Sequence, residues 1–319
     1  MNIGAESFED EEIRSFINNT VSRQVDLRDL ADFFGEFLCL FIKDDNGFRL
    51  AELLQRDWRI FSSMEIAEKI LSAVIELEGW NLTVNDKVSY IPEIQSCFAR
   101  WERLKSEVKS EKRYFTDLRN FDWETYLVCN AVIKSGQVLY RARISMNDHC
   151  HFDVKDMGCP PIEKATAGRA NPLGIPYLYL CHDAETTLYE VRAVYLDKVS
   201  VGKFVINSNL DIVDFSSDIN LFYAYTESGS ALKDIIQRKI IFNQISADLS
   251  KPLRRFDSEL EYVPTQMICE YCKLNGADGI RFNSSLHKGG KNIVLFNYGN
   301  AVCVEVTDKE VNNVIIESK

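Results

Sequence analysis

The side chains best suited to chemistry lie in one short stretch, GRANPLGIPYLYLCHDAETTLYE, residues 168–190. Arg169 stands in a loop that is stiff and irregular, because proline fixes φ and glycine adopts turns that other residues avoid. Tyr179 lies in an alternating segment typical of a half-buried strand. Asp183 fits the N-cap of a helix that carries Glu190. This order predicts a strand–helix corner that directs a cation, an aromatic ring and a carboxylate to one place.

Glu190 is the candidate acidic group. It stands beside Leu188 and Val191, which we expect to face the core of the protein. A carboxylate at such a border is partly desolvated and therefore needs a charged or hydrogen-bonding partner. Arg169 can present its forked donors to a phosphate or diphosphate. The alternatives are an ordinary surface glutamate and an arginine that only closes its own loop with a salt bridge.

A second polar loop, SSLHKGGKN, covers residues 284–292 between two expected strands. Gly289 and Gly290 let a ligand approach backbone N–H groups, and Lys288 and Lys291 favour an anion. The loop lacks the spacing of a nucleoside-triphosphate-binding P-loop. A flexible hairpin loop without a ligand is the alternative.

Metal and redox chemistry are not expected. The residues that could ligate zinc are His149, Cys150, His151, Cys159, Cys181 and His182. Their spacing matches no standard zinc motif. Cys269 and Cys272 form a CxxC pair in the middle of an expected helix, whereas redox pairs stand at a helix N-terminus, so we expect both in the core. The sequence contains no nucleophile elbow, HExxH motif or Rossmann fingerprint.

The composition limits the partners of the protein. The net charge is −11 and the pI is about 5.0, which argues against broad binding to nucleic acid. Residues 1–12 are acidic and lack the features of a signal peptide, and the apolar segment 33–42 is too short to span a bilayer. We therefore expect a cytoplasmic protein with reduced cysteines and no membrane partner.

Residues 1–125 are expected to form a helical domain with a regulatory or partner-binding role, although an ordinary helical core is the alternative. Apolar residues recur at helical spacing between Leu27 and Phe41, and a turn signal follows at residues 44–47. Ser62 and Glu65 form a capping-box pattern. Segment 105–119 is charge-dense and marks either the domain boundary or a solvated helix face.

From residue 138 the pattern changes to short strands, so residues 126–319 are expected to form a second domain. The expected strands cover residues 139–144, 177–180, 202–206, 210–213, 279–282, 293–296 and 301–306, and a helix is expected over 264–275. The chain is therefore predicted to be an α+β protein with an all-α N-terminal domain.

This second domain resembles the RES domain, a family named for its arginine, glutamate and serine. The matching pieces are Leu139-Tyr140-Arg141, Gly168-Arg169-x-Asn171-Pro172-x-Gly174, Leu178-Tyr179-Leu180, Leu188-x-Glu190-Val191, Gly279-Ile280-x-Phe282-x-Ser284 and Gly289-Gly290-x-Asn292-x-Val294-Leu295-Phe296. Their order and spacing agree with the family over roughly half of the chain, from about residue 139 to residue 296.

The resemblance implies a split β-sheet with flanking helices, like that of ADP-ribosyltransferase toxins. It places the family's catalytic residues at Arg169, Tyr179, Glu190 and Ser284. The substrate-binding residues that it implies are Tyr140, Arg141, Asn171, Gly290 and Asn292. Two positions depart from the family pattern, since an aromatic residue often stands at Ala170 and a tyrosine at Phe282. The first departure is expected to loosen stacking near the substrate.

RES proteins are toxins of toxin–antitoxin systems that destroy NAD⁺. The resemblance therefore implies cleavage of the nicotinamide–ribose bond, by phosphate (an NAD⁺ phosphorylase) or by water (a glycohydrolase). NAD⁺ is then a substrate, inorganic phosphate is a candidate co-substrate, and neither a cofactor nor a metal is needed. Glu190 would stabilise the cationic ribose, Arg169 and Arg141 would hold the diphosphate, and Tyr179 would pack on the nicotinamide riboside.

Two rival functions share these residues. An ADP-ribosyltransferase would use the same cleft to modify a protein or nucleic acid, and a non-enzymatic module would only sense NAD⁺. The family also implies an Xre-type antitoxin as a partner. Two further hypotheses are that the helical domain holds the cleft closed until a signal arrives, for example during phage infection, and that the protein forms a homo-oligomer.

Overall fold

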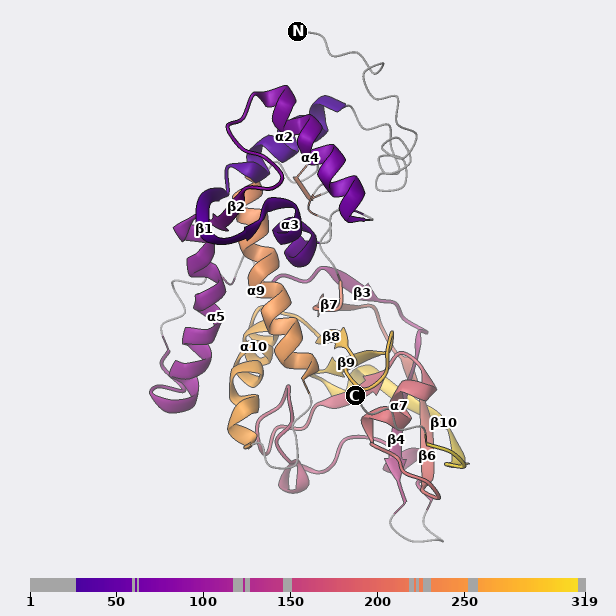
Figure 1. Cartoon of the computed structure of the whole chain (residues 1–319). Helices are drawn as coiled ribbons and strands as arrows, with labels where there is room; N and C mark the ends of the chain where they lie inside the picture. The colour runs from indigo at the N-terminus through magenta and orange to yellow at the C-terminus, as the bar shows by residue number, and fades with distance from the viewer. Residues whose placement is uncertain are drawn as a thin grey trace. The chain divides into compact units, whose positions relative to one another are not determined.

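The computed structural model of the chain describes residues 27–58, 61, 63–116, 123, 127–145, 151–217, 221, 224–225, 231–251 and 258–314 (Figure 1). It consists of two compact units, residues 1–100 with 219–240 and residues 101–218 with 241–319. Helices α5 (Pro92–Ser110) and α9 (Leu232–Ser250) contribute residues to both units. The boundary expected at residue 125 does not coincide with this division, because Trp101, Leu104, Val108 and Trp123 share a core with strands of the second unit.

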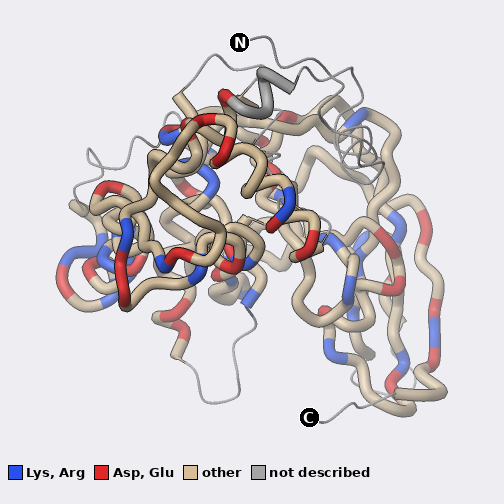
Figure 2. The backbone as a smooth tube through the Cα atoms, turned by 45° about the horizontal axis from the view of Figure 1, so that its top comes forward, with Lys and Arg blue, Asp and Glu red and all other residues tan. Residues whose placement is uncertain are grey.

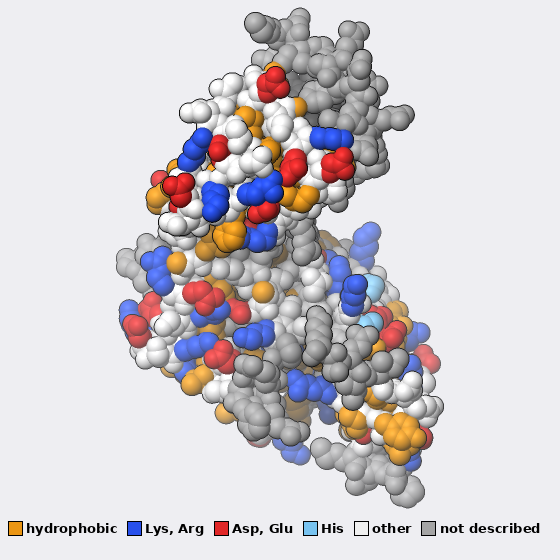
Figure 3. Space-filling model, in the orientation of Figure 1, with side chains coloured by type: hydrophobic (Ala, Val, Ile, Leu, Met, Phe, Trp, Pro, Cys, Tyr) orange, Lys and Arg blue, Asp and Glu red, His pale blue; other side chains and the backbone are white. Residues whose placement is uncertain are grey.

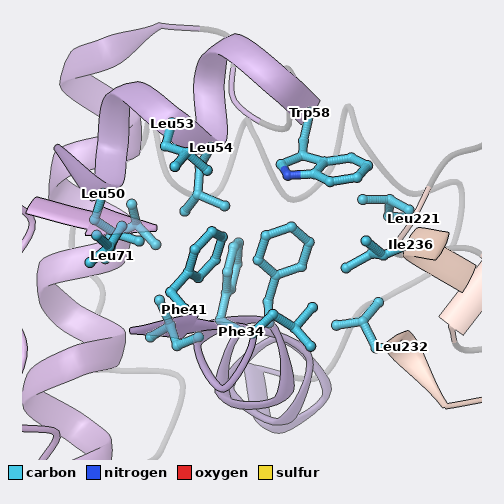
Figure 4. Packing of buried hydrophobic residues seen from close by; sticks show 14 of the residues in the cluster. Phe34, Phe41, Leu50, Leu53, Leu54, Trp58, Leu71, Leu221, Leu232 and Ile236 are labelled. Atoms are coloured by element: carbon cyan, nitrogen blue, oxygen red, sulfur yellow. The ribbon is translucent and has the colours of Figure 1, made fainter. Parts of the chain in front are cut away.

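The first unit contains helices α2 (Leu27–Leu38), α3 (Leu50–Trp58) and α4 (Met64–Glu78), strands β1 (Phe41–Arg49) and β2 (Lys87–Tyr90), and parts of α5 and α9. Its core is aromatic and aliphatic, and Figure 4 shows Phe34 and Phe41 between Leu50 and Leu54 on one side and Leu232 and Ile236 of α9 on the other. The apolar spacing produces the expected buried helix face at Phe33, Phe34, Phe37 and Leu38, whereas Phe41 begins strand β1.

This unit is not purely helical, which corrects the expectation of an all-α N-terminal domain. Strands β1 and β2 pair antiparallel, and their register shifts between Lys43 and Phe48. The predicted turn at residues 44–47 forms this irregularity, where a Cβ at Gly47 would collide with the carbonyl of Val88. The sequence correctly indicated short helices and a turn. The pairing of β1 with β2 joins residues that are distant in the sequence, so local spacing does not reveal it.

Helix ends in the first unit follow the expected chemistry, with one correction. The N-cap of α4 is Ser63, whose side chain accepts a hydrogen bond from the N–H of Ile66. Ser62, the residue expected there, lies outside the described residues. Gly79 ends the helix in the left-handed conformation, with φ 65°.

The second unit is built on an eight-stranded sheet in the order β10-β6-β4-β5-β9-β8-β7-β3. Its strands are β3 (Ala131–Ile133), β4 (Val138–Ile144), β5 (Leu178–Cys181), β6 (Lys198–Ile206), β7 (Leu210–Asp214), β8 (Gly279–Asn283), β9 (Lys291–Leu295) and β10 (Ala301–Glu310). Neighbouring strands are antiparallel except β7 and β8, which are parallel. The α+β class predicted from the sequence is confirmed.

The sheet is split between β4 and β5. These strands share only the pair Tyr140 and Cys181, whereas β4 pairs with β6 from Val138 to Ile144 and β5 pairs with β9 from Leu178 to Cys181. Beyond the single shared pair, the edge of β4 and the edge of β5 diverge. The split sheet implied by the RES resemblance is therefore present, and it leaves room between two strands.

Side-chain alternation gives the sheet two differently covered faces. One face carries Leu139, Leu178, Phe204 and Leu295, which form a single core cluster. On the opposite face, helix α7 (Ala184–Glu190) covers β4 and β6, as Figure 1 also shows. Helix α10 (Val263–Leu274) and the second halves of α5 and α9 pack on the remaining strands. The split therefore lies between α7 and the α9–α10 layer.

Helix α9 differs from the sequence-based expectation, whereas helix α10 was expected. Helix α9 was not anticipated, because its apolar residues belong to two different cores and do not form one stripe. In helix α10, Leu274 is 81% exposed, whereas Gln266, Cys269 and Cys272 are buried. The CxxC pair is therefore in the core as predicted, and burial raises the pKa of the Cys272 thiol to about 12.

Charged residues of both signs are interspersed along the described backbone (Figure 2) and on the face of the molecule seen in Figure 3. In the part of the chain that the structure describes, short 3₁₀ helices at residues 154–156, 162–164, 259–262 and 298–300 connect the larger elements. Among the described residues, no helix is both long enough and apolar enough to cross a membrane.

Candidate active site at the split of the sheet

A cavity of about 320 Å³ opens in the second unit where β4 and β5 diverge. It is lined by Tyr140, Arg141, Ala142, Gly168, Arg169, Tyr179, Leu180, Cys181, Thr187, Glu190, Val191, Tyr262, Phe282 and Asn292. Six of the nine predicted site residues are on this wall, although they come from three distant parts of the chain. The other three, Asn171, Ser284 and Gly290, support the wall from behind.

Glu190, the last residue of helix α7, is anchored through one carboxylate oxygen. Oε1 accepts hydrogen bonds from the hydroxyl of Ser284 at 2.6 Å and from Nδ2 of Asn292 at 2.8 Å. Oε2 lies 4.0 Å from Nη2 of Arg169, and the two side chains are 21% and 14% exposed. Asp183 caps α7 as predicted, accepting from the N–H of Thr186. The helix therefore carries the carboxylate to the cavity with one oxygen fixed.

Ser284 is oriented entirely by protein groups. Its Oγ accepts from the backbone N–H groups of Leu286 at 3.2 Å and His287 at 3.1 Å. A serine hydroxyl has two acceptor sites and one proton, so the proton is left for Glu190. Ser284 therefore acts on the carboxylate from behind the cavity wall.

Asn292 links Glu190 to strand β5. Its Oδ1 accepts a hydrogen bond from the thiol of Cys181 at 3.3 Å, and its Nδ2 donates to Glu190. Burial raises the pKa of the Cys181 thiol, and the charges of Glu190 and Asp183 add to this effect, so the thiol keeps its proton. This arrangement fixes which end of the amide faces the carboxylate.

The guanidinium of Arg169 faces both the cavity and the end of helix α9. Its Nη1 donates to the carbonyl oxygens of Leu249 at 3.3 Å and Ser250 at 3.5 Å. Such carbonyls at a helix C-terminus are partly negative and have no partner within the helix. Arg169 is thus held by weak neutral acceptors on one side and by Glu190 on the other.

The backbone of the arginine loop is held by two neighbouring side chains of α10. Nε2 of Gln266 donates to the carbonyls of Gly168 at 2.8 Å and Asn171 at 3.0 Å. The hydroxyl of Thr265 donates to the carbonyl of Arg169 at 2.7 Å. Both side chains are buried, so these hydrogen bonds are shielded from water. The loop that carries Arg169 is therefore rigidly attached to helix α10.

Tyr179 and Asn171 complete the support of this loop. The hydroxyl of Tyr179 accepts from the N–H of Ala170 at 3.0 Å and donates to Oδ1 of Asn171 at 2.7 Å. Nδ2 of Asn171 donates to the carbonyls of Thr166 and Ile175. Burial raises the pKa of Tyr179, so its hydroxyl remains a donor. The ring of Tyr179 lines the cavity, whereas Asn171 supports the loop from within the protein.

Ala170 is fully buried and belongs to the core under the sheet. Ala170 is not among the residues that line the cavity, and its effect on stacking near the substrate stays a prediction. Phe282, the second departure, does line the cavity.

Tyr140 and Arg141 line the cavity from the edge of β4. Nη1 of Arg141 is buried and has no hydrogen-bond partner among the described residues. Burial and the neighbouring charge of Arg143 lower the pKa of the Arg141 guanidinium, while Cys159 acts in the opposite direction. A buried cation with an unsatisfied donor is stabilised by an anion.

Gly290 lies against helix α7 and not on the cavity wall. A Cβ at this position would be 2.6 Å from Oγ1 of Thr186 and 3.1 Å from Nδ1 of His287. The N–H of Gly290 donates to the carbonyl of His287, and its carbonyl accepts from the N–H of Ser284. Glycine is therefore needed at this position for the loop to approach α7 closely. Several backbone N–H groups that we expected to bind an anion instead donate to acceptors within the loop.

The described residues contain no group of three or more histidine, cysteine, aspartate or glutamate side chains that could hold a metal ion. Of the candidate zinc ligands, His149 and Cys150 lie outside the described residues. Cys181 donates to Asn292, and Cys159 interacts with Arg141.

Sequence reasoning missed Thr265, Gln266, Thr187 and Tyr262. Thr187 and Tyr262 line the cavity, and Thr265 and Gln266 hold the arginine loop. Two adjacent polar residues at the start of an apolar helix were the available signal for the last pair. Their partners are backbone carbonyls about 95 residues earlier in the chain, which no local pattern indicates.

No curated protein matches the chain. Among solved structures, it is similar to a chain in the crystal structure of the M. tuberculosis MbcT–MbcA toxin–antitoxin complex, with 14% identity and a TM-score of 0.32. That match covers 56% of this chain and 86% of the other, and it is too distant to support an inference about function. The family model of the RES domain matches residues 138–312, which is more than half of the sequence and includes every predicted site residue. The chain belongs to the RES domain family.

Proposed function

We propose that this protein consumes NAD⁺ by cleaving the bond between ribose and nicotinamide. The observation that carries the proposal is the placement of Glu190. Its carboxylate is fixed by Ser284 and Asn292 through Oε1, while Oε2 stands at a cavity whose wall also carries Arg169 and Arg141. A fixed negative charge beside two cations fits a substrate that has a diphosphate and develops positive charge on a sugar.

The chemistry follows from the leaving group. Nicotinamide departs as a neutral molecule and leaves an oxocarbenium-like ribose, which a nearby carboxylate stabilises. We assign this role to Oε2 of Glu190, because Oε1 already accepts two hydrogen bonds. Ser284 and Asn292 then hold the carboxylate in place, and Ser284 itself need not touch the substrate.

We assign the diphosphate to Arg141 and Arg169. The buried Nη1 of Arg141 lacks a hydrogen-bond partner among the described residues, and an anion would supply one. Arg169 now contacts two carbonyl oxygens at 3.3 and 3.5 Å, which are weaker acceptors than a diphosphate. The cavity of about 320 Å³ is of the size that accepts part of a dinucleotide, such as its nicotinamide riboside end.

Tyr179 is assigned to packing against this end of the substrate. Its hydroxyl already donates to Asn171 and accepts from Ala170, so the ring is the part that it presents to the cavity. The attacking nucleophile is water or inorganic phosphate. For phosphate, the loop of residues 288–292 is the candidate seat. The N–H of Gly290 already donates within the loop, so Lys288 and Lys291 are the groups that would bind the anion.

Destruction of NAD⁺ harms the cell that carries it out, so we propose that the protein acts as a toxin restrained by a partner. Membership of the RES family favours an Xre-type antitoxin in the cytoplasm. Whether the protein forms a homo-oligomer, and whether its first unit responds to phage infection, are separate hypotheses.

The direct test is mass spectrometry of the products formed by the full chain from NAD⁺, with and without inorganic phosphate. Hydrolysis yields nicotinamide and ADP-ribose, and phosphorolysis yields ADP-ribose-1″-phosphate. We expect Glu190→Gln to lower the rate of nicotinamide release about 100-fold or more, as the loss of electrostatic stabilisation in comparable sites does. Glu185→Gln, an exposed glutamate of the same helix, is the matched control.

Two outcomes would contradict the proposal. Normal NAD⁺ consumption by Glu190→Gln would remove the carboxylate from the mechanism. Label from NAD⁺ that appears on protein or nucleic acid in a lysate, without free ADP-ribose or its phosphate, would instead indicate an ADP-ribosyltransferase.

A further inference from the structure

Loop 284–290 is tied to helix α7 by a residue that does not line the cavity, His287. Its Nδ1 lies 2.8 Å from Oγ1 of Thr186, in the first turn of α7. Its ring also stacks on Tyr189, with ring centroids 4.6 Å apart and planes inclined by 3°. One side chain therefore joins the loop to both ends of a helix of seven residues.

The same loop determines the geometry of the carboxylate. The N–H of His287 donates to Oγ of Ser284, and Ser284 donates to Oε1 of Glu190. Tyr189, the residue stacked on His287, directly precedes Glu190 in the helix. His287 is thus connected to Glu190 by two short routes, one through the loop and one through α7.

Hydrogen-bond donors and acceptors in this cluster can be assigned from chemistry. Oγ1 of Thr186 is 2.7 Å from Oδ2 of Asp183, and an ionised carboxylate can only accept. Although burial acts to raise the pKa of the Asp183 carboxyl, the hydrogen bonds from Thr186 lower it below its ordinary value. Thr186 must therefore give its proton to Asp183 and accept one from His287, so the neutral imidazole carries its proton on Nδ1.

The tight fit of the loop is consistent with this assignment. Gly290 lies so close to Thr186 and His287 that any Cβ would enter the space between the loop and α7. Gly290 therefore permits the close approach of the loop to α7, and the contacts of His287 stabilise it.

We propose that His287 is a positioning residue of the RES active site. Its Nδ1–H bond to Thr186 and its stacking on Tyr189 hold loop 284–290 against α7, and this keeps the hydroxyl of Ser284 directed at Glu190. The kinetic part of this proposal rests on the proposed cleavage of NAD⁺. The structural part concerns the tautomer of His287 and stands independently.

The structural part is tested by long-range ¹H–¹⁵N NMR of the histidine rings in the full chain. The sequence has four histidines, and His287→Ala identifies the signal that belongs to this one. In spectra recorded at a pH where the ring is neutral, we expect its proton on Nδ1. A ring protonated on Nε2, or one that averages between both tautomers, would overturn the assignment.

The kinetic part is tested with three variants that separate the two contacts. His287→Asn retains a donor near Nδ1, His287→Phe retains the stacking, and His287→Ala retains neither. We expect His287→Ala to lower kcat for NAD⁺ cleavage about tenfold or more, because a hydrogen bond to a charged catalytic group is disturbed. KM should change about twofold or less, since the diphosphate-binding arginines are not affected. His287→Asn should recover most of the lost kcat.

His182→Ala is the matched control, because this histidine is exposed and stands just before the cap of the same helix. It should leave kcat unchanged. Wild-type kcat in both His287→Ala and His287→Asn would overturn the positioning role, even if the tautomer is as assigned. A full chain that cleaves no NAD⁺ overturns the proposed function and, with it, the kinetic role of His287, whereas the NMR result still decides the tautomer.

Discussion

The hydroxyl of Ser284 lies 2.6 Å from Oε1 of Glu190, and both of its acceptor sites are taken by backbone N–H groups of its own loop. The serine supplies a hydrogen bond to the carboxylate and leaves the other carboxylate oxygen to the cavity.

Replacement of Ser284 by alanine should therefore impair the chemical step more than substrate binding. A hydrogen bond to a charged group contributes about 1.5–3 kcal/mol, so kcat for NAD⁺ cleavage should fall about 10- to 150-fold while KM changes little. Steady-state kinetics of nicotinamide release measure both constants. Ser285→Ala is the control, because Ser285 is exposed. A large rise in KM at unchanged kcat would place Ser284 on the bound substrate instead.

Replacement of Gln266 by methionine should affect the arginine loop. The variant keeps the shape of the side chain but removes the hydrogen bond from Gln266 to the carbonyl of Gly168, at a cost of about 1–3 kcal/mol in unfolding free energy. The carbonyl of Asn171 also loses its hydrogen bond from Gln266 but still accepts one from the N–H of Gly168. Because the loop carries Arg169, we also expect a higher KM for NAD⁺. Urea unfolding and steady-state kinetics test these two effects.

Glu270→Gln provides the comparison for Gln266, since Glu270 is an exposed residue of the same helix. If Gln266→Met lowers the stability but leaves KM and kcat as in the wild type, the hydrogen bonds from Gln266 to the arginine loop support the fold and have no role in positioning Arg169.

The pair of Asp214 and Arg281 should make stability depend on pH. Although burial acts to raise the pKa of the Asp214 carboxyl, the hydrogen bonds from Arg281 and Ser216 lower it below its ordinary value of 3.8. A depressed folded-state pKa means that the stabilisation is complete above pH 3.8 and is lost as the pH falls through the lower folded value. Asp214→Asn should cost about 3–5 kcal/mol at neutral pH, because it leaves a buried guanidinium without its counter-charge.

Chemical unfolding of wild type and Asp214→Asn at several pH values measures this difference, which should shrink as the pH falls below 3.8. Asp153 is an exposed carboxylate 3.8 Å from Lys155, so Asp153→Asn should show almost no difference in unfolding free energy from the wild type at any of these pH values. A difference that stays constant from neutral to acidic pH would mean that the charge of Asp214 does not contribute.

Trp101 should be essential for the stability of the second unit. It is fully buried in the core under the sheet, and its Nε1 donates to Oδ2 of Asp248 at 2.6 Å. Trp101→Ala should lower the unfolding free energy by about 3–5 kcal/mol, as large-to-small core substitutions do. Phe115→Ala, at a side chain that is 90% exposed, should have little effect. A truncation that begins at residue 126 removes Trp101 and should destabilise the remaining chain for the same reason.

The secondary structure around the site residues could be predicted from the sequence, because it depends on neighbouring residues in the chain. Asp183 caps α7, Tyr179 lies in a strand and Glu190 ends a helix, and each depends on residues within a few positions. The period of two in the strands likewise indicated which residues share a face. The order of short matching motifs was sufficient to identify the RES family.

The sequence did not reveal the partners of these groups, because hydrogen bonds and packing join residues that are distant along the chain. Strand β1, helix α9 and the hydrogen bonds from Gln266 to the arginine loop depend on such contacts. The same holds for the roles of individual side chains. Ala170, where the sequence predicted looser stacking near the substrate, belongs to the core, and Gly290 lies against α7.

The amino-acid sequence by itself determined which groups are available: a loop arginine, a strand tyrosine, a helix glutamate and a serine before a glycine-rich turn. Only the tertiary structure decided that β4 and β5 share a single residue pair, so that a cavity opens between them and Glu190 meets Arg169 there. The physical reason is that side-chain types follow from local sequence, whereas a split in a sheet depends on how strands far apart in the chain pair with one another.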